Sequence, residues 1–313
     1  MSEPLSRAGL AYGAGAYLIW GTFPLLMAAL KPAGALEITA HRAVWSVLVC
    51  AIIVAAVDAW RRVRSALTNP RTLGILALAA FFIAINWLIY VYATVTEHVN
   101  SAALGYYINP LFTVALGVVF LGERLRRLQV VAIGIATIAV VVIGVGLGEF
   151  PWIALALATS FGLYGLIKKR VGSSVDALTG LTVETLVLAP AALVGLWWIH
   201  DSGRQTFAVR GAEGLGGGHD LLLMSTGVFT AGALLLFAAG ARRLPLYVTG
   251  LLQYIAPTLM FILAVWHFGE PMPVSRWIGF SLVWVALVVL TVDGWRLGRS
   301  RRGEARVEPA EPV

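Results

Sequence analysis

Ionisable side chains are rare inside the long apolar stretches of this chain, so the few that occur there are informative. One stretch carries Glu37, His41 and Arg42. Glu37 and His41 are four residues apart and share one face of a helix, whereas Arg42 is rotated by about 140° from Glu37. A charge at the centre of a membrane helix costs about 2.5–3.5 kcal/mol, so such residues are candidates for function by default.

Two interpretations of this group stay open. In the first, Glu37, His41 and the later Glu184 gain and lose protons during a transport cycle, and Arg42 contacts a substrate. In the second, the group is a cluster of ionic contacts near the membrane interface that only fixes helix packing. In both, the rotation of Arg42 predicts a partner on another helix.

Amides and aromatic side chains form a second set of candidates. A proline within an apolar helix frees a backbone carbonyl, which is tolerated only where protein or a wet cavity satisfies it. Tyr106, Tyr107 and Asn109 precede Pro110, and Gln253 and Tyr254 precede Pro257. The candidates for lining a cavity are Trp20, Asn86, Trp87, Tyr90, Tyr107, Asn109, Gln253 and Tyr254. The alternative role for these residues is helix–helix packing.

The elements that position these residues are ten apolar stretches, each long enough to cross a membrane. Of the 313 residues, 59% are hydrophobic and 12% are charged, against about 25% charged in soluble domains. A spanning helix needs roughly 20 apolar residues. The expected spans are 8–28, 36–57, 73–93, 100–120, 128–147, 151–167, 178–199, 221–240, 246–267 and 275–293. The predicted fold class is an all-α integral membrane protein.

The positions of the basic residues predict the orientation. With a cytoplasmic N-terminus, 18 of the 23 Lys and Arg residues fall in inner segments and four in outer ones. Basic loops stay in the cytoplasm, so we expect a multi-pass cell-membrane protein with both termini inside. The net charge of +7 is explained by these loops and by the lipid surface, so nucleic acid is not an expected partner.

The chain also contains an internal repeat. An offset of 147 residues places the Tyr107, Pro110 and Gly122-Glu123 pattern on Tyr254, Pro257 and Gly269-Glu270. An odd number of spans per copy inverts the second copy relative to the first, as in many transporters. We therefore expect two inverted five-helix repeats, residues 1–147 and 148–295, followed by a disordered cytoplasmic tail, 296–313.

Several segments resemble the drug/metabolite transporter superfamily of the EamA type, and within it the RarD family. They are AYLIWGTFPL at 16–25, LEITAHRAVWS at 36–46, INWLIYVYA at 85–93, ALGYYINPL at 103–111, SFGLYGLIKK at 160–169, LLLFAAGARRLPL at 234–246 and GLLQYIAPT at 250–258. The resemblance covers residues 5–295 and implies a ten-helix permease or exporter.

A secondary transporter of small solutes or drugs, working by alternating access, is the favoured function. A structural or regulatory membrane protein is the alternative, and an intramembrane enzyme is the weaker one because H-E-x-x-H and G-x-S-x-G are absent from the sequence. No cofactor or metal is expected. The expected partners are a small-molecule substrate and the lipid bilayer, with protons and a second copy of the chain left open.

Overall fold

The structure is a computed structural model that describes residues 6–121, 126–148, 150–171, 175–209, 216–241, 243–244 and 252–307. Within these residues it is entirely helical, which confirms the all-α part of the predicted fold class. The helices are α1 (Arg7–Ala29), α2 (Ala35–Ala56), α3 (Trp60–Thr68), α4 (Pro70–Val95), α5 (Val99–Leu121), α6 (Arg127–Leu147), α7 (Trp152–Val171), α8 (Ala177–Asp201), α9 (Gly217–Ala241), α11 (Ile255–Ile262), the π-helical η1 (Leu263–His267) and α12 (Val274–Val307).

Seven of these helices are long and apolar enough to cross a membrane, judged by length and composition over the described residues: α1, α2, α4, α6, α8, α9 and α12. The apolar parts of α7 and of α11 with η1 are shorter. The expected span 100–120 coincides with α5, and residues 246–251 of the expected ninth span lie outside the described residues.

Two features differ from the expectation. A basic loop was expected at residues 60–68, but these residues form the short helix α3, which places Val63 and Ala66 on a buried face and its arginines outside. Helix α12 continues to Val307, past the expected span end at 293, where a disordered tail was predicted from 296. Residues 296–307 contain five arginines, which favour helix, and two glycines, which do not.

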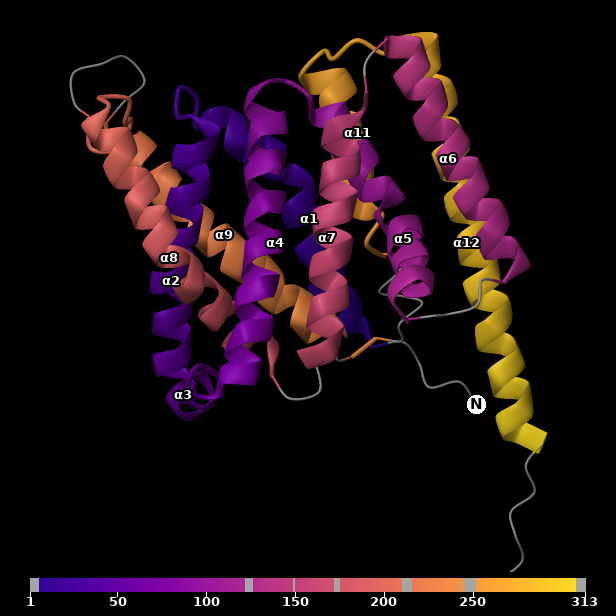
Figure 1. Ribbon diagram of the computed structural model, residues 1–313, viewed down its shortest axis with the longest axis horizontal. Coiled ribbons are helices and arrows are strands. Elements are labelled where there is room, and N and C mark those ends of the chain that lie inside the picture. The colour runs from indigo at the N-terminus through magenta and orange to yellow at the C-terminus, as the bar shows by residue number, and fades with distance from the viewer. Residues whose placement is uncertain are drawn as a thin grey trace, which may run out of the picture.

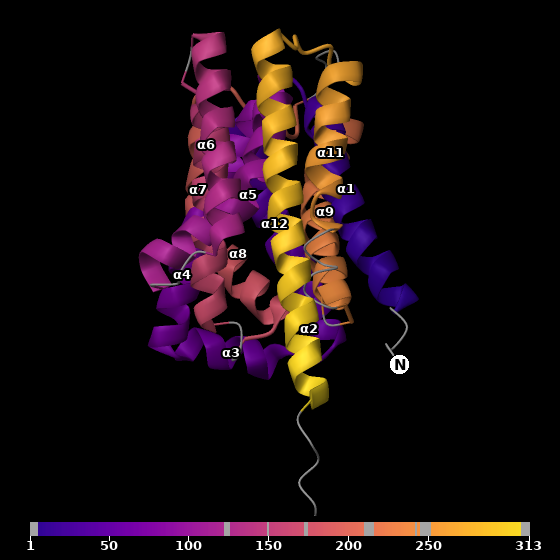
Figure 2. The same ribbon diagram turned by 90° about the vertical axis from the view of Figure 1, so that its right-hand side faces the viewer.

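The long helices stand side by side, with α2 and α8 at one edge of the bundle and α6 with α12 at the other (Figure 1). Helix α3 lies at the end of the bundle where α1 begins and α12 ends (Figures 1 and 2). The basic segment of α3, the start of α1 and the end of α12 therefore lie at the same end of the molecule.

The contacts between helices are mostly between elements distant in sequence. Helix α6 packs along α12, α5 along α7, α1 along α9, α2 along both α8 and α9, and α4 along α7 and α8. Glycines permit close approach of α1 and α9, because a Cβ on Gly240 of α9 would lie 2.8 Å from the backbone nitrogen of Gly13 in α1. Close backbone approach through small residues is typical of membrane helix packing.

The second Gly-Glu pair makes a contact between the two halves of the chain. Gly269 adopts a left-handed conformation, φ 64°, which glycine tolerates and which turns the chain after η1. The carboxylate of Glu270 then accepts hydrogen bonds from the backbone N–H groups of Val99 and Asn100, at the start of α5. The pair thus ends η1 and links the segment after it to the start of α5. Glu123 lies outside the described residues.

Candidate functional site

Arg42 of α2 is buried, and its side chain contacts residues of α1, α4 and α9. Its side chain is 4% exposed, and its Nε–H donates to Thr230 Oγ1 of α9 at 2.8 Å. The guanidinium lies 4.3 Å from the ring centroid of Trp87 in α4 and 5.1 Å from that of Phe23 in α1. The partner on another helix that the rotation of Arg42 predicted is therefore present. It is the Thr230 hydroxyl, and the rings of Trp87 and Phe23 lie beside the guanidinium.

The Arg42 charge has no ionic partner in the described part of the chain. The ion pairs found there are Lys31–Glu97, Arg62–Asp176, Arg126–Asp293 and Lys168–Glu184. A buried guanidinium without a carboxylate is costly, because cation–π contacts replace only part of its lost hydration. We name Arg42, Phe23, Trp87, Tyr90, Tyr106 and Thr230 the arginine cluster.

Two tyrosines complete the arginine cluster, and Tyr90 follows Trp87 by three residues on the same face of α4. The rings of Tyr90 and Tyr106 lie 5.9 Å apart, edge to face. Tyr106 donates its hydroxyl proton to Asn86 Oδ1 at 3.1 Å. No hydrogen bond of normal geometry reaches the buried Tyr90 hydroxyl from the described residues.

Asn86 positions this cluster. Its Nδ2 donates to the carbonyl of Leu157 and to Ser160 Oγ, both at 3.1 Å and both on α7. With the bond from Tyr106, the buried amide joins α4, α5 and α7. Asn86 thus acts as a helix–helix contact, and it holds the Tyr106 hydroxyl.

Glu37 and His41 lie apart from the Arg42 contacts. Glu37 Oε1 accepts hydrogen bonds from the backbone N–H groups of Thr206, at 2.7 Å, and Phe207, at 3.1 Å. His41 Nδ1 accepts from Trp45 Nε1 at 3.2 Å, and its ring lies 4.6 Å from that of Phe207. Both residues therefore fix the segment that follows α8. Glu37 Oε2 is buried and unpaired among the described residues.

Glu184 forms a separate ionic group between α7 and α8. Its Oε1 is 2.6 Å from Lys168 Nζ, and its Oε2 accepts from the Tyr164 hydroxyl at 3.2 Å. The carboxylate is 2% exposed and the lysine 27%. Long lysine side chains near helix ends reach towards the interface in this way.

The remaining candidates are dispersed. Tyr107 Oη is 2.8 Å from Thr258 Oγ1, which joins α5 to α11. Asn109 has a buried Oδ1 without a partner among the described residues. Trp20 packs on Tyr17 and Phe237, with ring centroids 5.3 and 5.7 Å away. Gln253 and Tyr254 are half-buried directly before α11.

Sequence reasoning selected Arg42, Trp87 and Tyr90 but left Phe23 and Thr230 out of the site. Thr230 lies 188 residues from Arg42, and no local spacing relates the two. One signal was available for Tyr106, because it stands next to Tyr107 and before Pro110. Phe23 and Thr230 are ordinary residues of apolar helices, and they carry no such signal.

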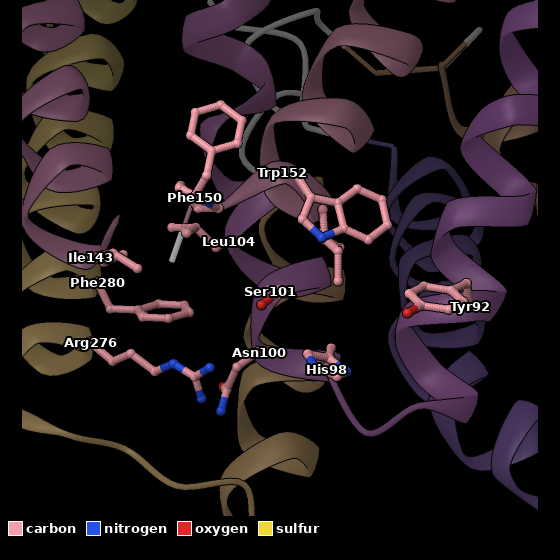
Figure 3. Close-up of a pocket in the computed structure, with 12 residues that line it drawn as sticks. Tyr92, His98, Asn100, Ser101, Leu104, Ile143, Phe150, Trp152, Arg276 and Phe280 are labelled. Atoms are coloured by element: carbon pink, nitrogen blue, oxygen red, sulfur yellow. The ribbon is translucent and has the colours of Figure 1, made fainter. Parts of the chain in front are cut away.

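A separate pocket of about 130 Å³ lies where α5, α6, α7 and α12 meet (Figure 3). Figure 3 shows the guanidinium of Arg276 and the amide of Asn100 facing one another, with Trp152 and Tyr92 on the other side. Asn100 is 1% exposed, and both of its side-chain polar atoms lack partners in the described residues. None of the residues predicted for the site lines this pocket.

Comparison with known proteins decides the family. The profile of the EamA-like transporter family matches twice, over residues 7–145 and 151–292. This chain belongs to the EamA-like transporter family. "Protein RarD" of Streptomyces exfoliatus is 49% identical over 312 residues, which cover 100% of this chain and 96% of the relative.

Two further relatives also cover most of the chain. "Uncharacterized transporter YojE" of Bacillus subtilis is 43% identical, over 93% of this chain and 96% of its own length. "Chloramphenicol-sensitive protein RarD" of Pseudomonas aeruginosa is 33% identical, over 96% and 98%. A solved structure titled "Crystal structure of protein" superposes with a TM-score of 0.57 at 21% identity, over 92% of this chain and 99% of that one, and shows the same fold.

These comparisons confirm the resemblance to the RarD family of the drug/metabolite transporter superfamily. The chain is a multi-pass membrane protein of a transporter family. Because its relatives carry transporter names and its family is defined by transport, the prediction that it is not an enzyme is confirmed as well.

Proposed function

We propose that this protein is a secondary transporter that moves small solutes past the arginine cluster by alternating access. The observation that carries the proposal is the buried Arg42 charge, held between α1, α2 and α4 of the first half and α9 of the second. A charge in such a place marks a substrate pathway more readily than a packing contact. A solute bound there touches both halves of the chain.

The pattern of helix contacts supports two inverted repeats, 1–147 and 148–295. The repeat makes α1 equivalent to α7, α2 to α8, α4 to α9, α5 to α11 and α6 to α12. Exchanging equivalents turns the α1–α9 contact into α7–α4, α2–α9 into α8–α4, and α5–α7 into α11–α1. Both members of each pair are present. The contacts α2–α8, α5–α11 and α6–α12 map onto themselves, as contacts across a two-fold axis do.

The two matches of the family profile also support this division, since the first match ends at residue 145 and the second begins at residue 151. Rocking of one repeat against the other around a fixed midplane site is the usual form of alternating access. In this proposal the pairs α2–α8, α5–α11 and α6–α12 meet across the axis. Both termini are placed in the cytoplasm, where the basic residues of α3 also lie.

Counterflow in proteoliposomes tests the proposal. Vesicles containing the purified full chain are loaded with one unlabelled solute and exposed to a trace of the same labelled solute. The panel contains amino acids, aromatic acids, and chloramphenicol because one relative's name refers to it. Transient accumulation of at least one solute, absent from protein-free vesicles, is expected. A protein that is inserted correctly and accumulates none of them contradicts the proposal.

We also propose that Tyr107, Asn109 and Tyr254 belong to the transport pathway. Tyr107→Phe removes the contact with Thr258 between α5 and α11, and Tyr254→Phe and Asn109→Ala alter the residues before the two prolines. We expect all three to lower counterflow without lowering the amount of protein in the membrane. If all three transport normally, these residues are packing elements and do not belong to the pathway.

A further inference from the structure

The proposed transport site contains a permanent positive charge with no negative partner in the described part of the chain. A guanidinium stays protonated at every physiological pH. Of its five N–H donors, the contacts found among the described residues use one, the Nε–H bound to Thr230. The two terminal nitrogens are thus left with donors for another acceptor.

The surroundings of Arg42 are suited to a flat, apolar group attached to an anion. Trp87 and Phe23 place aromatic rings on the guanidinium. Tyr90 follows Trp87 by three residues on the same face of α4, and its hydroxyl, buried and without a partner in the described residues, offers a further donor there. A carboxylate matches the planar fork of arginine in a bidentate fashion and accepts a phenol hydrogen bond beside it.

The nearest carboxylate in sequence is not available to neutralise Arg42. Glu37 is committed to the N–H groups of Thr206 and Phe207 on the segment after α8. Its position on the helix is rotated by about 140° from that of Arg42. A solute that brings its own negative charge completes the site, whereas a cation meets repulsion that a low dielectric strengthens.

We propose that the substrate of this transporter is a small organic anion, with a carboxylate bound by Arg42 and a flat apolar part against Trp87 and Phe23. The inference rests on the proposed function and adds the charge and shape of the solute. It assigns Arg42 as the counter-charge of the substrate, Tyr90 as a second donor to the anion, and Asn86 as the residue that positions Tyr106 beside them.

A series of three probes of similar shape tests the sign of the charge. Benzoate is an anion, benzamide is neutral, and benzylamine is a cation at neutral pH. Thermal unfolding of the purified full chain in detergent is measured against increasing concentrations of each probe. We expect benzoate to raise the unfolding temperature in a saturable manner, and benzamide and benzylamine to have at least tenfold weaker effects. This arm uses the unaltered protein, so it does not depend on a variant that folds.

Three variants then assign the effect to Arg42. Arg42→Gln is expected to weaken benzoate binding at least tenfold, and Arg42→Lys to weaken it less, since lysine keeps the charge but loses the planar fork. Lys31→Gln is the matched control, because Lys31 is an exposed cation paired with Glu97 outside the site. It is expected to bind benzoate as the unaltered protein does.

The proposal is overturned if benzoate has no saturable effect, if benzamide or benzylamine stabilises the protein as strongly, or if Arg42→Gln keeps benzoate binding. Failure of the transport proposal looks different. Counterflow of a neutral or cationic solute that is unaffected by Arg42→Gln would leave a working transporter with another substrate class, whereas absence of counterflow for every solute would remove transport itself.

Discussion

Arg42 of α2 and Thr230 of α9 are joined by a hydrogen bond of 2.8 Å from Nε to Oγ1, although the two residues are 188 positions apart. Both side chains are buried. The bond connects the two halves of the chain at a buried charge that has no ionic partner among the described residues. It also orients the guanidinium so that its terminal nitrogens are left for another acceptor.

We expect that removing the Thr230 hydroxyl destabilises the protein more than removing the neighbouring Thr226 hydroxyl. We expect Thr230→Val to lower the free energy of unfolding by about 1–2 kcal/mol, because it leaves a charged donor buried and unpaired. Thr226→Val is the control, since its hydroxyl bonds only within α9, to the Leu223 carbonyl. Unfolding in mixed micelles measures both. Equal losses would show that the Arg42 bond contributes nothing of its own.

Glu270 and Glu97 lie outside the spans, and we expect them to make the stability of the fold depend on pH in opposite directions. Burial raises the pKa of Glu270, although the N–H groups of Val99 and Asn100 partly oppose the shift. Its contribution to stability is therefore full below the unfolded-state value of 4.5 and declines as the pH rises towards the folded value. The hydrogen bond from Lys31 lowers the pKa of Glu97. The Glu97 contribution is present above 4.5 and is lost as the pH falls through the lowered value.

Glu270→Gln and Glu97→Gln separate these effects. As the pH rises above 4.5, the unfolding temperature of the unaltered protein is expected to fall relative to that of Glu270→Gln. As the pH drops below 4.5, it is expected to fall relative to that of Glu97→Gln, by less because Glu97 is fully exposed. Calorimetry across this range measures both differences. The same sign for the two would contradict the assignment.

Proton coupling is tested at Glu37. If a proton gradient drives transport, Glu37→Gln should keep exchange of solute for solute and lose its dependence on an imposed pH gradient. The amide keeps an oxygen that accepts from Thr206 and Phe207, so the segment after α8 stays anchored. An unchanged pH dependence would remove Glu37 from coupling and leave His41 and Glu184 to be tested in the same way.

The orientation is tested by labelling single cysteines in intact cells. Cys50 is buried, so Cys50→Ser gives a background without reactive thiols. Cysteines replacing Arg62 or Arg243 are expected to resist an impermeant thiol reagent, and one replacing Arg204, in the segment after α8, is expected to react. The reverse pattern would place both termini outside.

Much of the fold was predictable because the membrane imposes it. Spans of a set length must satisfy their backbone hydrogen bonds internally, so apolar stretches in the sequence correspond to helices in the structure. The amide of Asn86 was expected to need a partner, and it has three. The rotation of Arg42 away from Glu37 likewise predicted that it reaches another helix.

The remaining features depend on contacts between distant segments. Glu37 looked like a site residue, yet it bonds to a segment 169 residues away that carries no recognisable motif. Thr230 was missed because one threonine in an apolar helix has no distinguishing pattern. The helix α3 was missed because only Val63 and Ala66 of its short apolar face are buried against the bundle.

Counterflow of labelled benzoate into benzoate-loaded proteoliposomes tests the central claim most directly. The account predicts transient accumulation with the unaltered chain and with Lys31→Gln, and a loss of at least tenfold with Arg42→Gln at equal amounts of inserted protein. Accumulation that is the same in Arg42→Gln as in the unaltered chain would show that the arginine cluster is not the transport site, and would contradict the account.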